Sequence, residues 1–418
     1  MLLDRLFTLL PLYAMTAFVL SGLSLLGRWL HLVAGIAWIG ASFYFIWLDN
    51  HLRAQSRADA ADRGIFGELW AVHGGGFYNA RKYRVAPEIL PPTLHWFYWE
   101  AYTTFLSGFF LLCLLYYAQA EVYLIDPSVM VLSKPAAVAI GIAFLAGGWG
   151  VYDGLCRSAL GRNGPLLAGV LAVVLSAAAW GLCHLFSGRG AYMEFGAMLG
   201  TIMVANVFFV IIPGQRELVR AKRENREPDP AYGVAGKLRS THNTYFTLPV
   251  LFVMTSHHYS MTYGAHDNWL VLIAICAAGT LLRVYFVSRH KADERDGHTS
   301  PWPAAIGALI LAGVALALSP HTGPASQDSG TRADAVFARV QTIIAQRCSS
   351  CHSTKPTQAG FTAAPNGVLL DTPEHIRARA AQIHQQVSTR VMPLGNITGM
   401  TEADRAEVLA WSGHADAP

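Results

Sequence analysis

The chain has 418 residues, of which 53% are hydrophobic and only 14% are charged, with a mean hydropathy of +0.33. Soluble domains carry about 25% charged residues, so this composition indicates that much of the chain faces lipid. The net charge of +4 is too small to favour a nucleic acid as a partner. The six cysteines do not suggest a disulfide framework, because four of them are scattered in or beside apolar segments.

Apolar runs long enough to cross a bilayer recur along the first three quarters of the chain. They predict eight membrane-spanning helices, near residues 29–48, 97–118, 136–153, 164–186, 193–212, 245–262, 269–288 and 302–319. Residues 1–27 form an N-terminal apolar extension, which is a ninth span, a signal anchor or part of one long first helix. The expected fold is therefore all-α, with a polytopic helical bundle in a lipid bilayer.

Lysine and arginine are distributed unevenly between these spans. One alternate set of connections, beginning with the segment 49–96, holds eighteen of them, and the opposite set holds only Lys134 and Arg189. Connections rich in positive charge face the cytoplasm. The residues that follow the last span are therefore expected on the periplasmic side.

The connection after the first firm span contains an unusual segment, "AVHGGGFYNARKYRVAPEILPPTLHWFYWEAY", at residues 71–102. Three glycines follow His73 and permit positive φ, and basic, aromatic and proline residues come next. One interpretation is a re-entrant segment that binds a planar anionic substrate. The other, equally open, is a positively charged loop that only sets the membrane topology, with its aromatic residues at the interface. Glu100 lies a few residues inside a predicted span, where a carboxylate is costly and usually has either an interaction partner or a functional role. The stretch "LRSTHNTYFTLP" places His242 and Asn243 at the same depth.

Four histidines are expected near the periplasmic ends of their spans: His31, His184, His257 and His258. Histidines on different helices at one level could ligate the iron of a b-type haem, with His31 and His258 as the first pair to consider. The alternative is that each one hydrogen-bonds to a neighbouring helix or to solvent.

A Pro/Gly/Ser-rich linker at residues 320–332 leads to a final unit at 333–418. Its first helix carries an apolar face and ends in "CSSCH", which places Cys348, Cys351 and His352 in the C-x-x-C-H pattern of covalent c-type haem attachment. His352 is then the proximal iron ligand. Met392 is the expected second iron ligand, with Met400 as its competitor. This predicts a small all-α, class I-like cytochrome c domain, and bacterial haem attachment outside the cytoplasmic membrane agrees with the periplasmic placement.

Several long segments together resemble the bacterial membrane-bound urate oxidases, or urate hydroxylases of the PuuD type. They are "RWLHLVAGIAWIGASFYFIWLDN", "HGGGFYNARKYRVAPEILPPTLHWFYWEAY", "SGRGAYMEFGAMLGTIMVANVFFVIIPGQR" and "STHNTYFTLPV". The resemblance implies a membrane domain at 28–319 that oxidises urate to 5-hydroxyisourate in purine catabolism. It also implies that electrons pass to the chain's own c-type haem, held by Cys348, Cys351, His352 and Met392, and then to a downstream cytochrome or terminal oxidase of the inner membrane.

The roles of the urate-site residues are hypotheses from chemistry. Urate is a flat monoanion, which an arginine can bind by a paired contact, so Arg81 or Arg84 is expected to bind it. His73 is a further candidate, and Tyr83, Trp96 or Phe97 would stack on the ring. His95 or Glu100 would act as the base that helps water attack C5, with His242 and Asn243 positioning the water. Two other functions remain open: a quinol-oxidising membrane cytochrome, and a non-enzymatic membrane-anchored electron carrier or haem-based sensor.

Overall fold

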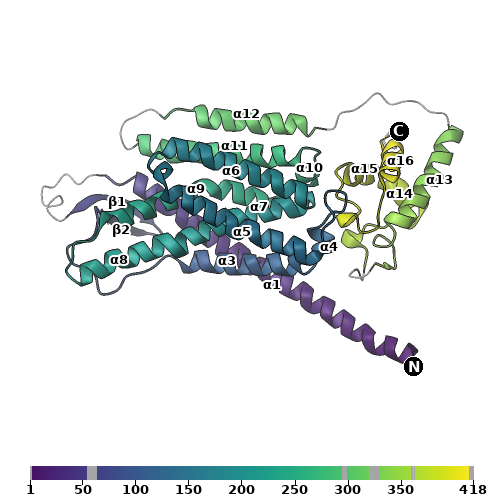
Figure 1. Ribbon diagram of the computed structural model, residues 1–418, viewed down its shortest axis with the longest axis horizontal. Helices are drawn as coiled ribbons and strands as arrows, with labels where there is room; N and C mark the ends of the chain where they lie inside the picture. Colours follow the sequence, from purple (N-terminus) through teal and green to yellow (C-terminus); the bar gives the residue numbers. More distant parts are fainter. Residues whose placement is uncertain are drawn as a thin grey trace.

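The computed structural model describes residues 2–53, 64–293, 299–319, 330–358, 361 and 363–413. These residues form a bundle of long helices followed by a smaller helical unit (Figure 1). The expected linker at 320–332 lies outside the described residues except for its last three positions.

Helices coincide with all eight expected spans. They are α1 (Leu2–Asn50), α3 (Trp99–Leu112) continued by the π-helical turn η1 (Cys113–Tyr117), α5 (Lys134–Arg157), α6 (Gly164–Leu185), α7 (Gly188–Asn206) continued by η3 (Val207–Ile211) and α8 (Ile212–Arg223), α9 (Pro230–Ser256), α11 (Asn268–Asp293) and α12 (Trp302–Ala317). Within the described residues, six of these segments are long and apolar enough to cross a membrane, and α9 and the 16-residue α12 fall outside that set.

The first helix settles how the N-terminal extension relates to the first span. α1 is continuous over 49 residues, so residues 2–27 belong to one long first helix. Its N-terminal part extends away from the bundle, whereas its C-terminal part packs against α3 (Figure 1).

α7 forms the centre of the bundle. It packs against α3, α5, α6 and α9, and most of its residues are buried. Ser187 begins the helix, because its hydroxyl accepts a hydrogen bond from the Gly190 amide. This helix is therefore the central element around which the other helices of the bundle pack.

A β-hairpin departs from the all-α expectation. Strands β1 (Ile65–His73) and β2 (Gly76–Tyr83) pair antiparallel across Gly74 and Gly75, whose φ angles are +56° and +80°. Both turn positions need positive φ, which glycine adopts without strain. The first part of the expected re-entrant segment is therefore a ribbon that pairs its own backbone groups, and residues 84–98 are irregular.

The C-terminal unit has a separate small core. It comprises α13 (Gly330–Arg347), η4 (Pro365–Gly367), α14 (Pro373–Ala378), α15 (Ala380–Ser388), η5 (Leu394–Asn396) and α16 (Glu402–Ser412). The apolar face expected on its first helix is confirmed, since Phe337, Val340 and Ile344 pack together with Val408 of α16. The N-terminus of α16 is held by a capping box formed by Thr401.

This C-terminal unit lies against one end of the bundle, which we call the docking end. Val391 packs against the bundle core, and η5 contacts α4 (Ala120–Tyr123). Beside α10 (Ser260–Tyr263) the approach is so close that a Cβ on Gly264 would lie 2.2 Å from the Thr389 carbonyl oxygen. The hairpin lies at the other end, the hairpin end (Figure 1).

Candidate functional site

A cavity of about 2150 Å³ opens at the hairpin end. It lies between α1, the irregular segment 84–98, the α7–α8 region and α9. Ligand pockets for small molecules typically measure about 300–1,000 Å³, so one planar ligand would occupy only part of this space. Seven of the expected site residues line it: Tyr83, Arg84, His95, Trp96, Phe97, Glu100 and Asn243.

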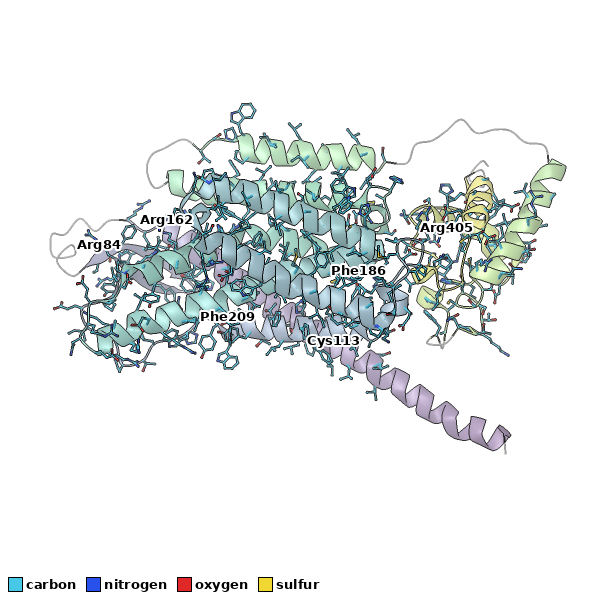
Figure 2. All side chains as sticks on the ribbon, in the orientation of Figure 1. Arg84, Cys113, Arg162, Phe186, Phe209 and Arg405 are labelled. Carbon is cyan, nitrogen blue, oxygen red and sulfur yellow. The ribbon has the colours of Figure 1, made fainter. Side chains whose placement is uncertain are left out.

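The charged groups of the cavity wall leave one arginine available. Lys82 donates to Asp49 at 2.6 Å, and Lys237 lies 3.6 Å from the same carboxylate. Arg84 is exposed, and among the described residues no carboxylate pairs with its guanidinium. Figure 2 shows Arg84 at the hairpin end. The wall is therefore cationic, and Arg84 is the group best able to meet an anion.

Two other expected substrate ligands lie outside the cavity wall. Arg81 is exposed on β2 and donates to Glu68 at 3.3 Å and to the Asn79 side-chain oxygen at 2.9 Å. His73 is exposed at the hairpin turn. The geometry therefore favours Arg84 over Arg81 and His73.

Aromatic rings form the part of the wall that follows the hairpin. Trp96 is half-buried and packs beside Trp38 against Ala101 and Val207. Phe97 meets the His95 ring edge to face, with 4.9 Å between centroids. An aromatic wall next to a cationic group suits a flat anionic ring.

Glu100 is the carboxylate that faces this wall. It lies in the first turn of α3. Among the described residues no hydrogen bond or ion pair engages its carboxylate, and the Thr104 hydroxyl donates to its backbone carbonyl at 2.6 Å. Glu100 is therefore a free carboxylate within the cavity.

A buried hydrogen-bond network holds Asn243 in the cavity wall. The Asn243 side-chain oxygen accepts from Asn206 at 2.8 Å, and its amide nitrogen donates to the Met203 carbonyl at 2.9 Å. Arg239 donates to the Asn206 oxygen at 3.3 Å and to Asp153 at 2.6 Å. Arg239 is only 4% exposed. Two hydrogen bonds to α7 thus fix the Asn243 side chain where it lines the cavity.

His242 belongs to the same network but points away from the cavity. Asn206 donates its second amide hydrogen to the Tyr152 oxygen at 3.1 Å, and the Tyr152 hydroxyl lies 2.8 Å from His242 Nδ1. The donor in the Tyr152–His242 hydrogen bond depends on the tautomer of His242. His242 does not line the cavity, so it supports the wall rather than facing a ligand.

Four members of this network were not expected from the sequence: Tyr152, Asp153, Asn206 and Arg239. The available signal was a polar residue inside an apolar run, as at Asn206 in "MVANVFF". Only the packing of α5, α7 and α9 brings these side chains together.

The C-x-x-C-H motif forms a tight turn directly after α13. The Cys351 and His352 amides donate to the Cys348 carbonyl at 3.1 and 2.9 Å. His352 places Nδ1 3.1 Å from the Val368 carbonyl oxygen, so Nδ1 carries the hydrogen and Nε2 is left as the free ring nitrogen. Both cysteines are unpaired.

A carboxylate stabilises the loop that carries this turn. Asp371 accepts from the Thr354 amide at 2.9 Å, and His375 Nδ1 lies 3.0 Å away. The amide hydrogen bond, followed by the histidine, lowers the pKa of Asp371 to about 2. The preceding residue, Leu370, donates its amide to the His352 carbonyl at 2.7 Å.

The two methionines after α15 have different surroundings. Met400 is 3% exposed and belongs to the core of the C-terminal unit. Met392 is half-buried, and its carbonyl accepts from the buried Arg405 guanidinium at 2.9 Å. Burial lowers the pKa of Arg405. This arginine, seen next to the docking end in Figure 2, was not expected from the sequence.

The four histidines considered as ligands of a b-type haem lie on α1, on α6 and at the end of α9. The His31 ring donates to the Thr104 carbonyl at 3.0 Å and so faces α3. His184 is exposed, with Nδ1 2.7 Å from the Trp180 carbonyl. The His257 and His258 rings lie 3.9 Å apart at the end of α9. No ring contact or hydrogen bond joins His31 to His258 in the described chain, and their pairing stays a prediction.

Comparison with known families identifies the bundle. The family model described as "Urate oxidase N-terminal" matches residues 17–319, which include most of α1 and all the later helices through α12. No curated protein and no solved structure matches the chain.

Proposed function

The chain belongs to the urate oxidase N-terminal family, and on that basis we propose that it is a membrane-bound urate oxidase that converts urate to 5-hydroxyisourate. The observation that carries this proposal is the composition of the cavity wall. A free arginine, an aromatic wall and a free carboxylate face one space at the hairpin end. These are the groups that a flat organic anion requires for binding and oxidation.

The binding step follows from Arg84 and Trp96. The Arg84 guanidinium donates two parallel hydrogen bonds to the urate anion, and charge-assisted contacts of this kind contribute about 1.5–3 kcal/mol each. Trp96 and Tyr83 stack on the purine. Lys82 and Lys237 raise the local positive potential although Asp49 partly neutralises them.

The oxidation step balances with one water. The urate monoanion and water yield 5-hydroxyisourate, one proton and two electrons. Glu100 takes the proton from the attacking water, with His95 as the alternative base. Asn243 orients that water, because two hydrogen bonds to α7 hold its side chain in the cavity wall.

The electrons pass to the C-terminal unit, for which we propose the role of a cytochrome c domain. Its residues fit a c-type haem: two unpaired thiols lie one turn apart, and His352 presents a free Nε2 beside them. Met392 would be the second iron ligand, since Met400 fills the core. When bound, such a haem supplies a one-electron acceptor. A downstream cytochrome or terminal oxidase would then receive the electrons.

Distance supports a second redox group within the bundle. α7 runs for 19 residues between the docking end and the network, which is about 28 Å at 1.5 Å per residue. A b-type haem held by two of His31, His184, His257 and His258 would shorten this gap. Among the described residues, no hydrogen-bond partner engages the buried Nδ1 of His257, which makes this residue a stronger candidate than the hydrogen-bonded His31.

The membrane arrangement is part of the same proposal. Eight spans, counting α9 and α12, would place the lysine- and arginine-rich connections and the cavity on the cytoplasmic side of a bacterial inner membrane. The C-terminal unit would then be periplasmic. Its position at the docking end, away from the cavity, agrees with this topology (Figure 1).

An anaerobic spectrum tests the proposal. The full chain is purified in detergent, oxidised and mixed with urate or with buffer while the visible spectrum is recorded. We expect a reduced c-type band with urate only, and an added b-type band if the bundle holds a haem. If dithionite reduces the haem and urate does not, the urate oxidase proposal is wrong, and a quinol analogue becomes the substrate to test.

A further inference from the structure

A buried carboxyl group in the docking half of the bundle takes no part in the proposed chemistry. Glu194, in the second turn of α7, is 0% exposed. Its Oε1 atom has no hydrogen-bond partner, and Oε2 accepts one long hydrogen bond of 3.4 Å from the Tyr117 hydroxyl. Among the described residues, no further group donates to either carboxylate oxygen, and no basic side chain forms an ion pair with them.

The neighbouring helices leave a defined space for this carboxyl group. A Cβ on Gly141 of α5 would lie 2.8 Å from Glu194 Oε1 and 3.0 Å from the Tyr117 hydroxyl oxygen. Tyr117 and Cys113 both belong to η1, and π-helical turns of this kind are rare and frequently occur at functional sites. Cys113 and Tyr117 are the titratable groups that face Glu194 from η1, and α5 presents only a glycine at this point.

The nearest arginine on the same helix is engaged elsewhere. The Arg189 guanidinium lies 4.8 Å from the centre of the Tyr123 ring and interacts with the Tyr116 hydroxyl. Residues five apart on a helix point about 140° away from each other, so α7 directs Arg189 and Glu194 to different neighbours. The carboxyl group therefore has a tyrosine as its partner and no cation.

A carboxylate buried without a cation is costly. A bound metal ion is not an alternative, because the described part of the chain contains no group of three or more His, Cys, Asp or Glu side chains arranged to hold one. A proton is the ligand that removes the charge within so small a space.

We propose that Glu194 is a proton-binding site whose occupancy follows the number of electrons held by the protein. The link to electrons rests on the proposed function, since electron transfer supplies the change in charge. When an electron arrives, the carboxylate takes one proton from water and becomes a carboxylic acid. When the electron leaves, the acid returns that proton, and only an O–H bond forms or breaks. The Tyr117 hydrogen bond stabilises the carboxylate in the second state.

Infrared difference spectra of the full chain in detergent, dithionite-reduced minus oxidised, test this site. We expect the carbonyl stretch of a protonated carboxylic acid to grow on reduction, to shift in D₂O and to be lost in Glu194→Gln. Glu121→Gln is the matched control, because Glu121 is an exposed carboxylate beside Lys134 near the same end of the bundle. This control should retain the band.

Tyr117→Phe keeps the test decisive if Glu194→Gln does not fold. It removes the one hydrogen bond that reaches the carboxyl group within the described chain, so the band should move to higher frequency. A visible spectrum of the same sample reports whether the haem is reduced. Two outcomes overturn the proposal. In the first, the haem is reduced but no carbonyl band responds to these variants; in the second, the band has the same intensity in the oxidised and reduced protein. Because dithionite is the reductant, this result is independent of whether urate is the substrate.

Discussion

Asp153 allows the buried network to be tested against a surface ion pair that uses the same carboxylate. Asp153 accepts from Arg239, which is 4% exposed, and from Arg157, whose side chain is 66% exposed, both at 2.6 Å. Asp153→Ala leaves the buried Arg239 guanidinium without a carboxylate partner among the described residues, with the Asn206 oxygen at 3.3 Å as an acceptor. Removing one partner of a buried pair costs about 3–5 kcal/mol. We expect a loss of that size in the free energy of unfolding, measured by titration with SDS in detergent micelles.

Arg157→Ala is the matched control, because it removes the exposed partner of the same carboxylate. Exposed pairs contribute about 0–1 kcal/mol, so this variant should unfold close to the wild type. The double variant Asp153→Leu/Arg239→Met removes both buried charges, and it should be more stable than Asp153→Ala alone. The reasoning is refuted if Asp153→Ala and Arg157→Ala lose similar free energies.

The remaining predictions concern the cavity and the C-terminal unit. Glu100→Gln should abolish urate turnover and leave the visible spectrum intact; normal turnover would remove it from the site. Arg84→Ala should raise the KM for urate roughly 10- to 100-fold, from about 1.5–3 kcal/mol of lost contact, whereas Arg81→Ala should change it less than about twofold; equal effects would contradict the placement of these arginines. Met392→Ala should lower the haem potential in a redox titration, and an unchanged potential would exclude Met392 as a ligand. Asp371→Asn should destabilise the C-terminal unit above pH 4. The difference in stability from wild type should disappear as the pH falls through about 2, because the folded-state pKa of Asp371 lies below the usual value of 3.8. Soret absorption of the full chain measures this difference, and a difference that persists at pH 2 would exclude the carboxylate as its cause.

The different orientations of two neighbouring residues on α9 could not be predicted from the sequence. His242 and Asn243 are consecutive on α9, and successive helical residues point about 100° apart. The structure turns Asn243 towards the cavity and His242 towards Tyr152. A single sequence identifies both as polar residues at one depth, but the choice between them depends on how α9 is rotated against α5 and α7.

The same limit applies to the basic residues after the hairpin turn. Arg81 lies opposite Glu68 in the β1–β2 register, and Arg84 follows the end of β2. The sequence pattern predicts one irregular re-entrant segment here, and such a segment gives Arg81 and Arg84 the same surroundings. Only strand pairing shows which arginine is already occupied.

The helical bundle, the C-terminal unit and the turn that carries Cys348, Cys351 and His352 could all be predicted from the sequence. These features are local: an apolar run must satisfy its backbone hydrogen bonds as a helix in lipid, and the C-x-x-C-H spacing spans five residues. The cavity wall, the Asp153–Arg239 network and the isolation of Glu194 became visible only in the folded structure. Each of these joins residues from helices that are distant in the chain, so their relation is set by helix packing and rotation, which local pattern does not specify.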